Sequence, residues 1–159
     1  MTVQVELSRI FIREMNEMQI IELAELEGSR SFPIVIGLPE AFAIERRLKG
    51  IEIARPQTHD LLGSIITMLG GTLTRIEITN LVEGTFFAVL VIDQNGAELQ
   101  VDSRPSDAIA LGVAHQVPIM VSEDVLEAAS SENIDSILDD EQTDLLEDND
   151  DLDLEDGTS

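Results

Sequence analysis

The chain opens with a strict alternation of apolar and polar residues. Positions 3, 5 and 7 are apolar, and positions 4, 6 and 8 are polar. This period of two predicts a half-buried β-strand. The alternation is lost over residues 10–12, which indicates a bulge or burial of both faces. Two further strands are expected over residues 18–26 and 32–36, so the chain begins as an antiparallel meander.

Two helices are expected after this meander. A proline at position 39 begins the first, which runs to Leu48 and ends before Gly50. The second begins at Thr58, whose hydroxyl is expected to cap its free N–H groups. Within it, apolar residues recur at helical spacing at positions 61, 62, 65, 66 and 69, and Gly70-Gly71 ends it.

The second half of the chain combines hairpins with helices. Strands are expected over residues 73–81, 85–92 and 97–102, with a short one over 118–121. Asn95-Gly96 is a strong signal for a type I′ turn, because both residues tolerate a positive φ. Helices are expected over 106–115 and directly after Ser122, a good N-cap residue. Together these elements predict an α+β fold with a mostly antiparallel sheet and several packed helices.

The acidic residues are distributed unevenly. Residues 123–159 contain half of the 32 Asp and Glu residues and no Lys or Arg, so the rest of the chain is only mildly acidic. We expect one folded domain over residues 1–130 and a disordered acidic tail over 131–159, because so many like charges cannot offset the entropy lost on ordering. The tail is expected to keep the protein in solution, or to bind a basic protein partner or the chain's own arginines.

Composition narrows the class of protein further. Apolar residues make up 43% of the chain, as expected for a globular protein. No apolar run reaches the ~20 residues needed to span a bilayer, so no membrane association is expected. No signal peptide is visible, which makes the cytoplasm the expected location. The absence of cysteine excludes disulfides, thiolate metal sites and cysteine nucleophiles.

Two segments of the chain share a pattern. Arg55-Pro56-Gln57-Thr58-His59-Asp60 and Arg104-Pro105-Ser106-Asp107 each place Arg-Pro, a hydroxyl residue and an aspartate at the start of an apolar helix. A fainter echo relates residues 33–35 to residues 118–121, since each segment precedes a helix. An internal duplication would produce such pairs.

These two segments carry the candidate chemistry. The free N–H groups at a helix start attract anions, and Arg55 and Arg104 can bind a phosphate or carboxylate through the guanidinium fork. His59 is a candidate general base, with Asp60 and Asp107 as catalytic carboxylates. The candidate substrate-binding hydroxyl groups are those of Thr58, Ser103 and Ser106. The simpler interpretation is that all of these residues form ordinary helix caps and structural ion pairs.

Phosphodiester hydrolysis commonly uses a divalent metal, and carboxylates are its usual ligands. Glu40, Asp60 and Asp102 are therefore the candidate ligands for an ion such as Mg²⁺ or Mn²⁺. Glu40 lies at a helix start and can point toward the same cleft as the two Arg-Pro segments.

The common phosphate-loop, serine-hydrolase and zinc-protease signatures are absent from the chain. Three segments nevertheless resemble the bifunctional nuclease domain family: residues 37–41 leading into a helix, residues 55–62 and residues 102–111. The resemblance extends from Val3 to Ala128 and does not include the acidic tail. It implies an α+β fold, a homo-oligomer and a nuclease, that is, a hydrolase acting on the phosphodiester bonds of DNA and RNA.

Charge favours a second hypothesis. Nucleic-acid binding depends mainly on Lys and Arg, and the chain has only nine of them. The alternative is a non-catalytic regulatory module that binds an anion or a protein partner, with the acidic tail as an interaction segment or as an inhibitor of the cleft.

Overall fold

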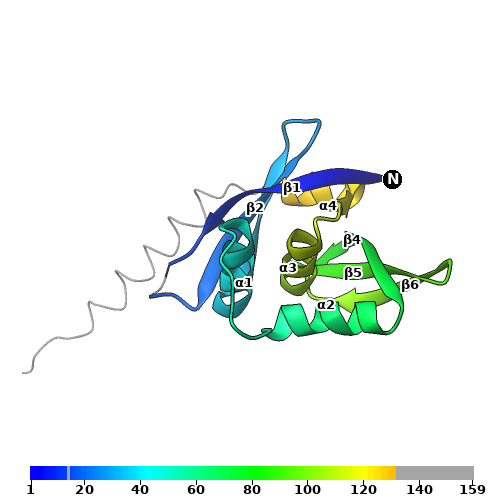
Figure 1. Cartoon of the computed structure of the whole chain (residues 1–159). Coiled ribbons are helices and arrows are strands. Elements are labelled where there is room, and N and C mark those ends of the chain that lie inside the picture. The colour runs from blue at the N-terminus through cyan, green and yellow to red at the C-terminus, as the bar shows by residue number, and fades with distance from the viewer. Residues whose placement is uncertain (14, 132–159) are drawn as a thin grey trace, which may run out of the picture.

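The computed structural model describes residues 1–13 and 15–131 and confirms the α+β fold (Figure 1). Within these residues, seven strands form one sheet and four helices pack against it. The strands are β1 (Thr2–Phe11), β2 (Met18–Glu25), β3 (Ser31–Gly37), β4 (Gly71–Val82), β5 (Thr85–Gln94), β6 (Ala97–Ser103) and β7 (Ile119–Ser122). The helices are α1 (Leu38–Leu48), α2 (Thr58–Met68), α3 (Pro105–His115) and α4 (Glu123–Ala129). The tail predicted beyond residue 131 lies outside the described residues.

The sheet consists of two three-stranded antiparallel meanders joined by β7. Its strand order is β3-β2-β1-β7-β4-β5-β6, and β7 pairs antiparallel to β1 and parallel to β4. Each meander leads directly into a helix, β3 into α1 and β6 into α3. This repeated order is what a duplication would produce. It relates α1 to α3, however, whereas the Arg-Pro echo relates α2 to α3, so the duplication stays a prediction.

The sheet is strongly bent. Phe32 in β3 stacks on Phe86 in β5 with ring centroids 5.7 Å apart, although four strands separate β3 from β5 in the sheet. Figure 1 shows α1 and α3 packed side by side between the two halves of the sheet. The side chains of Ile44, Ile76, Ile109 and Leu111 are fully buried there. The bend therefore brings the starts of α1 and α3 close together.

Several local predictions can be compared with the structure. Asn95 and Gly96 have φ values of 53° and 82°, which confirms the hairpin turn. The Ser122 hydroxyl accepts a hydrogen bond from the Val125 N–H, which confirms that cap. The predicted cap at Thr58 is wrong, because the N-cap residue of α2 is Gln57. Proline at the start of α3 likewise makes Arg104 its N-cap, and the predicted cap Ser106 lies inside the helix.

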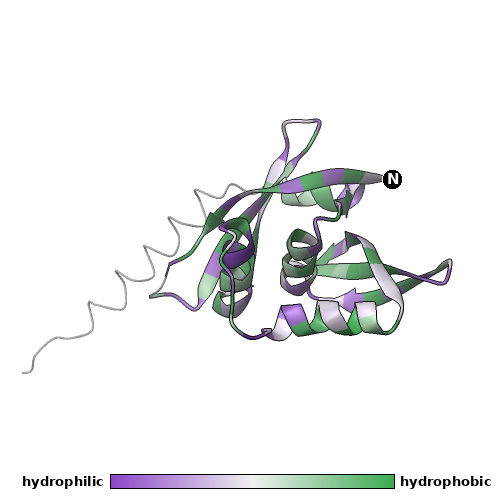
Figure 2. Cartoon of the chain, in the orientation of Figure 1, coloured by the Kyte–Doolittle hydropathy of each residue, from purple (hydrophilic) through white to green (hydrophobic). Residues whose placement is uncertain are grey.

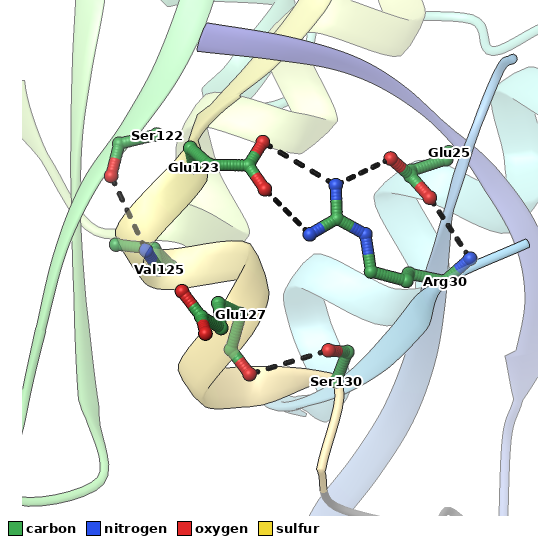
Figure 3. A network of polar contacts seen from close by, with 7 residues as sticks. All are labelled: Glu25, Arg30, Ser122, Glu123, Val125, Glu127 and Ser130. Atoms are coloured by element: carbon green, nitrogen blue, oxygen red, sulfur yellow. Dashed lines mark hydrogen bonds and ion pairs between the residues drawn. The ribbon is translucent and has the colours of Figure 1, made fainter. Parts of the chain in front are cut away.

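Helix α4 is tied to the first meander by Arg30 (Figure 3). The guanidinium group donates from Nη1 to Glu123 at 2.6 Å and from Nη2 to Glu25 at 2.8 Å. These bonds hold the pKa of both carboxyl groups below the ordinary glutamate value. A side chain at Gly28 would collide with the Glu25 carboxylate, whose Oε2 lies 2.2 Å from where its Cβ would be. Glycine at this turn therefore makes room for the Arg30 bridge.

Helix α2 lies at the periphery of the molecule with its apolar residues outward. Figure 2 shows hydrophobic segments along this helix at the lower edge of the view. Gly63 is its only buried residue, whereas Leu61, Ile65 and Met68 are 54%, 45% and 84% exposed. Helical spacing of apolar residues is typical of a face that packs on the core, and here most of that stripe faces away from it. No helix among the described residues is long and apolar enough to cross a membrane.

Candidate active site

The starts of three helices meet at one cleft of about 1110 Å³. The first turns of α1, α2 and α3 supply its polar side, and the end of β6 closes it. The polar side chains are Glu40, Gln57, Thr58, His59, Asp102, Ser103, Arg104 and Asp107. Leu61, Leu62, Leu90 and Val101 supply apolar lining. The two Arg-Pro segments therefore do share a cleft, although 48 residues separate His59 from Asp107.

Four of these side chains form one continuous chain of polar contacts. The Nε2 atom of His59 lies 2.9 Å from Oδ1 of Asp107. The second oxygen of Asp107 accepts from Nε of Arg104 at 2.9 Å. Nη2 of Arg104 donates to Oε1 of Glu40, also at 2.9 Å. Glu40 was expected to point toward this cleft, and it does.

Helix geometry explains why two carboxylates meet here. Glu40 and Asp107 each occupy the third position of a helix that follows directly on the last strand of a meander. Carboxylates are favoured in a first helical turn because its free N–H groups carry partial positive charge. Since α1 and α3 pack on each other, these two equivalent positions lie near enough for Arg104 to bridge them.

The bridge keeps the guanidinium group of Arg104 positively charged. Hydrogen bonds to Glu40 and Asp107 raise the pKa of Arg104 above its already high ordinary value, so this guanidinium stays charged. When Nε2 of His59 carries the proton, it donates a hydrogen bond to the Asp107 carboxylate, and Nδ1 keeps the free electron pair. The His59 side chain is only 14% exposed. Such an oriented, partly buried imidazole is what a general base requires.

Asp60 lies on the other side of α2, against α1. It accepts hydrogen bonds from Nη2 of Arg46 at 3.0 Å, from Arg47 and from the N–H of Gln57 at 2.9 Å. Burial raises its pKa, but the bonds from Gln57, Arg47 and Arg46 outweigh burial and hold the pKa below the ordinary aspartate value. Of the two adjacent residues chosen from the sequence, His59 thus lines the cleft, and Asp60 anchors the start of α2.

The remaining candidate residues are divided between the cleft and its surroundings. Asp102 and Thr58 are exposed and line the cleft, as does Ser103, whose hydroxyl donates to the backbone oxygen of Arg104. Arg55 is exposed in the loop before α2 and does not line the cleft. Ser106 is only 6% exposed and lines a separate hollow beside β3.

The candidate metal ligands do not form a coordination site. Asp60 is engaged with two arginines outside the cleft, and Glu40 is engaged with Arg104. Among the residues described, no three His, Asp or Glu side chains are grouped so that they could hold a metal ion. A divalent metal stays a prediction.

Sequence reasoning missed two features of this region. The apolar side of the cleft, Leu61, Leu62, Leu90 and Val101, comes from a helix and two strands that no motif connects. The second feature is Arg46, which no motif includes and which is buried and pairs with Asp60. The available signal was its spacing in α1, since Arg46 follows the buried Ala43 by three residues and therefore lies on the same face of the helix.

Comparison with known proteins shows the family of this chain. The sequence profile of the bifunctional nuclease domain matches residues 21–133, which include every residue of the cleft, and the chain belongs to this family. An uncharacterized protein of Mycobacterium tuberculosis (strain ATCC 25618 / H37Rv) is 40% identical over 126 residues, 79% of this chain and 75% of that protein. Bifunctional nuclease 2 of Arabidopsis thaliana is 27% identical over 93 residues, 57% of this chain and 28% of its own length. Bifunctional nuclease of Oryza minuta is 26% identical over the same number of residues.

Proposed function

We propose that this protein hydrolyses phosphodiester bonds in nucleic acids, with His59 as the general base. The observation that supports this most is the 2.9 Å contact between His59 and Asp107, which pairs an imidazole with a carboxylate inside the cleft. Membership of a family whose plant members are named bifunctional nucleases supports the reaction class.

Three residues of the polar chain, His59, Asp107 and Arg104, have a role in this reaction. Nδ1 of His59 takes a proton from water as the water oxygen attacks phosphorus. The bond from phosphorus to the leaving oxygen breaks with its electron pair, and that oxygen takes a proton from solvent. Asp107 orients the imidazole and stabilises its charged form. Arg104 uses Nε and Nη2 for the two carboxylates and offers Nη1 to a phosphate oxygen.

Charge and shape favour short, single-stranded substrates. Glu40, Asp102 and Asp107 outnumber Arg104 in the cleft, so little electrostatic attraction is available for a long polyanion. The apolar side chains of the cleft can instead cover a base, since an unpaired base exposes its face for packing. One or two nucleotides match a cleft of this size.

The two histidines of the chain allow a matched test. Full-length protein is incubated with single-stranded RNA and DNA in the presence of Mg²⁺, Mn²⁺ or EDTA. His59→Ala should lower the cleavage rate about 10²–10⁴-fold, the usual contribution of a general base. His115→Ala is the control, because His115 is exposed at the far end of α3 and should leave the rate unchanged. Equal rates in wild type and His59→Ala would refute the assignment.

A non-catalytic binding module is the second candidate. The excess of carboxylates in the cleft favours it, because both oxygens of Asp107 and one of Glu40 are already engaged in structural bonds. Absence of cleavage by the wild type under all three metal conditions would support this module. The acidic tail would then be tested as its interaction segment.

A further inference from the structure

We infer that the outer face of α2 binds α2 of a second copy of this chain, in an antiparallel pair whose two-fold axis passes near Ile65. We name this face the α2 face and define it by Leu61, Leu62, Ile65, Met68 and Leu69. The inference does not depend on the proposed hydrolase activity.

The α2 face exposes a large area of apolar surface. The five side chains of the α2 face are between 37% and 84% exposed. Leu99 and Val101 of the edge strand β6 are each 44% exposed, and Val101 lines the cleft together with Leu61 and Leu62. Together these side chains present on the order of 600 Å² of apolar surface, the upper end for the largest patch on a monomer. A stable interface buries about 800 Å² of surface on each partner. An interface that covers this patch and a narrow rim around it would therefore reach the area that a stable dimer needs.

The apolar residues of the α2 face are arranged symmetrically about Ile65. Leu61 and Leu62 precede Ile65 by four and three residues, and Met68 and Leu69 follow it by three and four. An antiparallel copy therefore sets Leu61 and Leu62 of one chain against Met68 and Leu69 of the other, with Ile65 against Ile65. A two-fold interface requires a patch that matches itself in this way.

Charge distinguishes a second copy from the other occupants. The whole chain carries −23, so two copies associate only through a surface free of exposed carboxylates. The sequence of α2 contains one acidic residue, Asp60, and that carboxylate is neutralised by Arg46 and Arg47. It contains no Lys or Arg, whereas helices that lie on membranes are usually rich in both.

The pairing would also complete the cleft. Leu61 and Leu62 belong both to the α2 face and to the cleft lining. The end of the partner's α2 would therefore lie across the cleft mouth and shield its apolar side from water. In a single copy this side of the cleft is open, and no other part of the described fold covers the apolar side chains of the α2 face. Pairing with a second copy would explain why these side chains are apolar.

The test measures the mass of the full-length protein in solution by light scattering and sedimentation. Wild type should have twice the monomer mass of 17.4 kDa. Ile65→Asp should give 17.4 kDa with an unchanged circular dichroism spectrum, because the charge is introduced twice at the axis and raises the dimer Kd at least about 100-fold. Val35→Asp, at a 41% exposed position on β3, is the matched control and should remain dimeric.

Cysteine cross-linking gives an independent readout, since the chain contains no cysteine. Ile65→Cys should form a disulfide-linked dimer under mild oxidation, because the axis brings the two copies of this position together. Ser64→Cys, one position along and about 100° around the helix, should link far less. A monomeric wild type, a dimer that survives Ile65→Asp, or equal cross-linking at positions 64 and 65 would each overturn the inference. If the wild type were monomeric, or if the dimer survived Ile65→Asp, the α2 face would bind something other than a second copy, such as the chain's own tail.

Discussion

Replacing Asp60 separates its structural role from the catalytic role suggested by the sequence. The carboxylate pairs with Arg46, and the two side chains are 13% and 10% exposed. Asp60→Ala leaves this buried guanidinium without its acceptor, and Nε and Nη1 of Arg46 already have no partner among the described residues. Breaking a buried ion pair from one side typically lowers the free energy of unfolding by 3–5 kcal/mol. Since domains of this size are stable by only about 5–15 kcal/mol, the loss is a large fraction of the total.

Urea unfolding followed by circular dichroism measures this change in free energy. Asp60→Ala should lower the free energy of unfolding by about 4 kcal/mol. Arg47→Ala is the matched control, because Arg47 donates to the same carboxylate but is 43% exposed, and exposed pairs contribute only about 0–1 kcal/mol. Adding Arg46→Met to Asp60→Ala removes the stranded charge and should restore part of the stability. A loss below about 1 kcal/mol in Asp60→Ala, or a double variant less stable than that single one, would refute the structural role.

Three further predictions follow from the geometry. The pKa of Asp60 is held below the ordinary value of about 4, and hydrogen bonds from Arg9 and Ser8 likewise lower the pKa of Glu22 in β2. The contribution of these two carboxylates to stability is therefore complete above about pH 5 and is lost as the pH falls through the lowered values, and acid titration of the free energy of unfolding should show this decline. Gly63→Ala should gain less than the ~1 kcal/mol by which Ala exceeds Gly in a helix, because the new Cβ would lie 2.5 Å from Nε2 of His115, and the same substitution should be more stabilising in a His115→Ala background in a thermal unfolding assay. Nucleic-acid affinity should depend weakly on salt, with a log–log slope of about −1 in a fluorescence titration, because Arg104 is the one cation among the residues that line the cleft. A slope of about −5 would indicate a basic surface elsewhere.

The sequence was sufficient for the elements of the fold, but it did not show that the two Arg-Pro motifs meet in one cleft. Alternation, proline and glycine positions and the Asn95-Gly96 turn depend on local backbone preferences, which hold wherever the segment lies. The motif pair predicted that His59 and Asp107 have related roles, and the structure brings them into contact. Glu40 was also placed correctly, because a first-turn carboxylate is constrained by the helix itself.

The errors concern features that depend on distant parts of the chain. Thr58 and Asp60 fit the pattern of a cap and a catalytic carboxylate, but the orientation of α2 against α1 turns Asp60 toward Arg46. The apolar spacing in α2 gave no indication that Ile65 would face outward, because periodicity identifies an apolar face without identifying what covers it. A surface that pairs with a second copy has the same pattern as one that packs on the core.

The four-residue strand β7 has a consequence for the order in which the protein forms during synthesis. Among the described strands, β7 alone joins the two meanders, since it pairs with both β1 and β4. It is also the last of them to be made, 85 residues after β3 ends at Gly37. At ribosomal rates of about 5–20 residues per second, the finished first meander waits roughly 4–17 s with the edge of β1 unpaired. Unpaired strand edges recruit other chains, so the nascent protein is most prone to aggregation in this interval, which ends when residues 119–122 insert between β1 and β4.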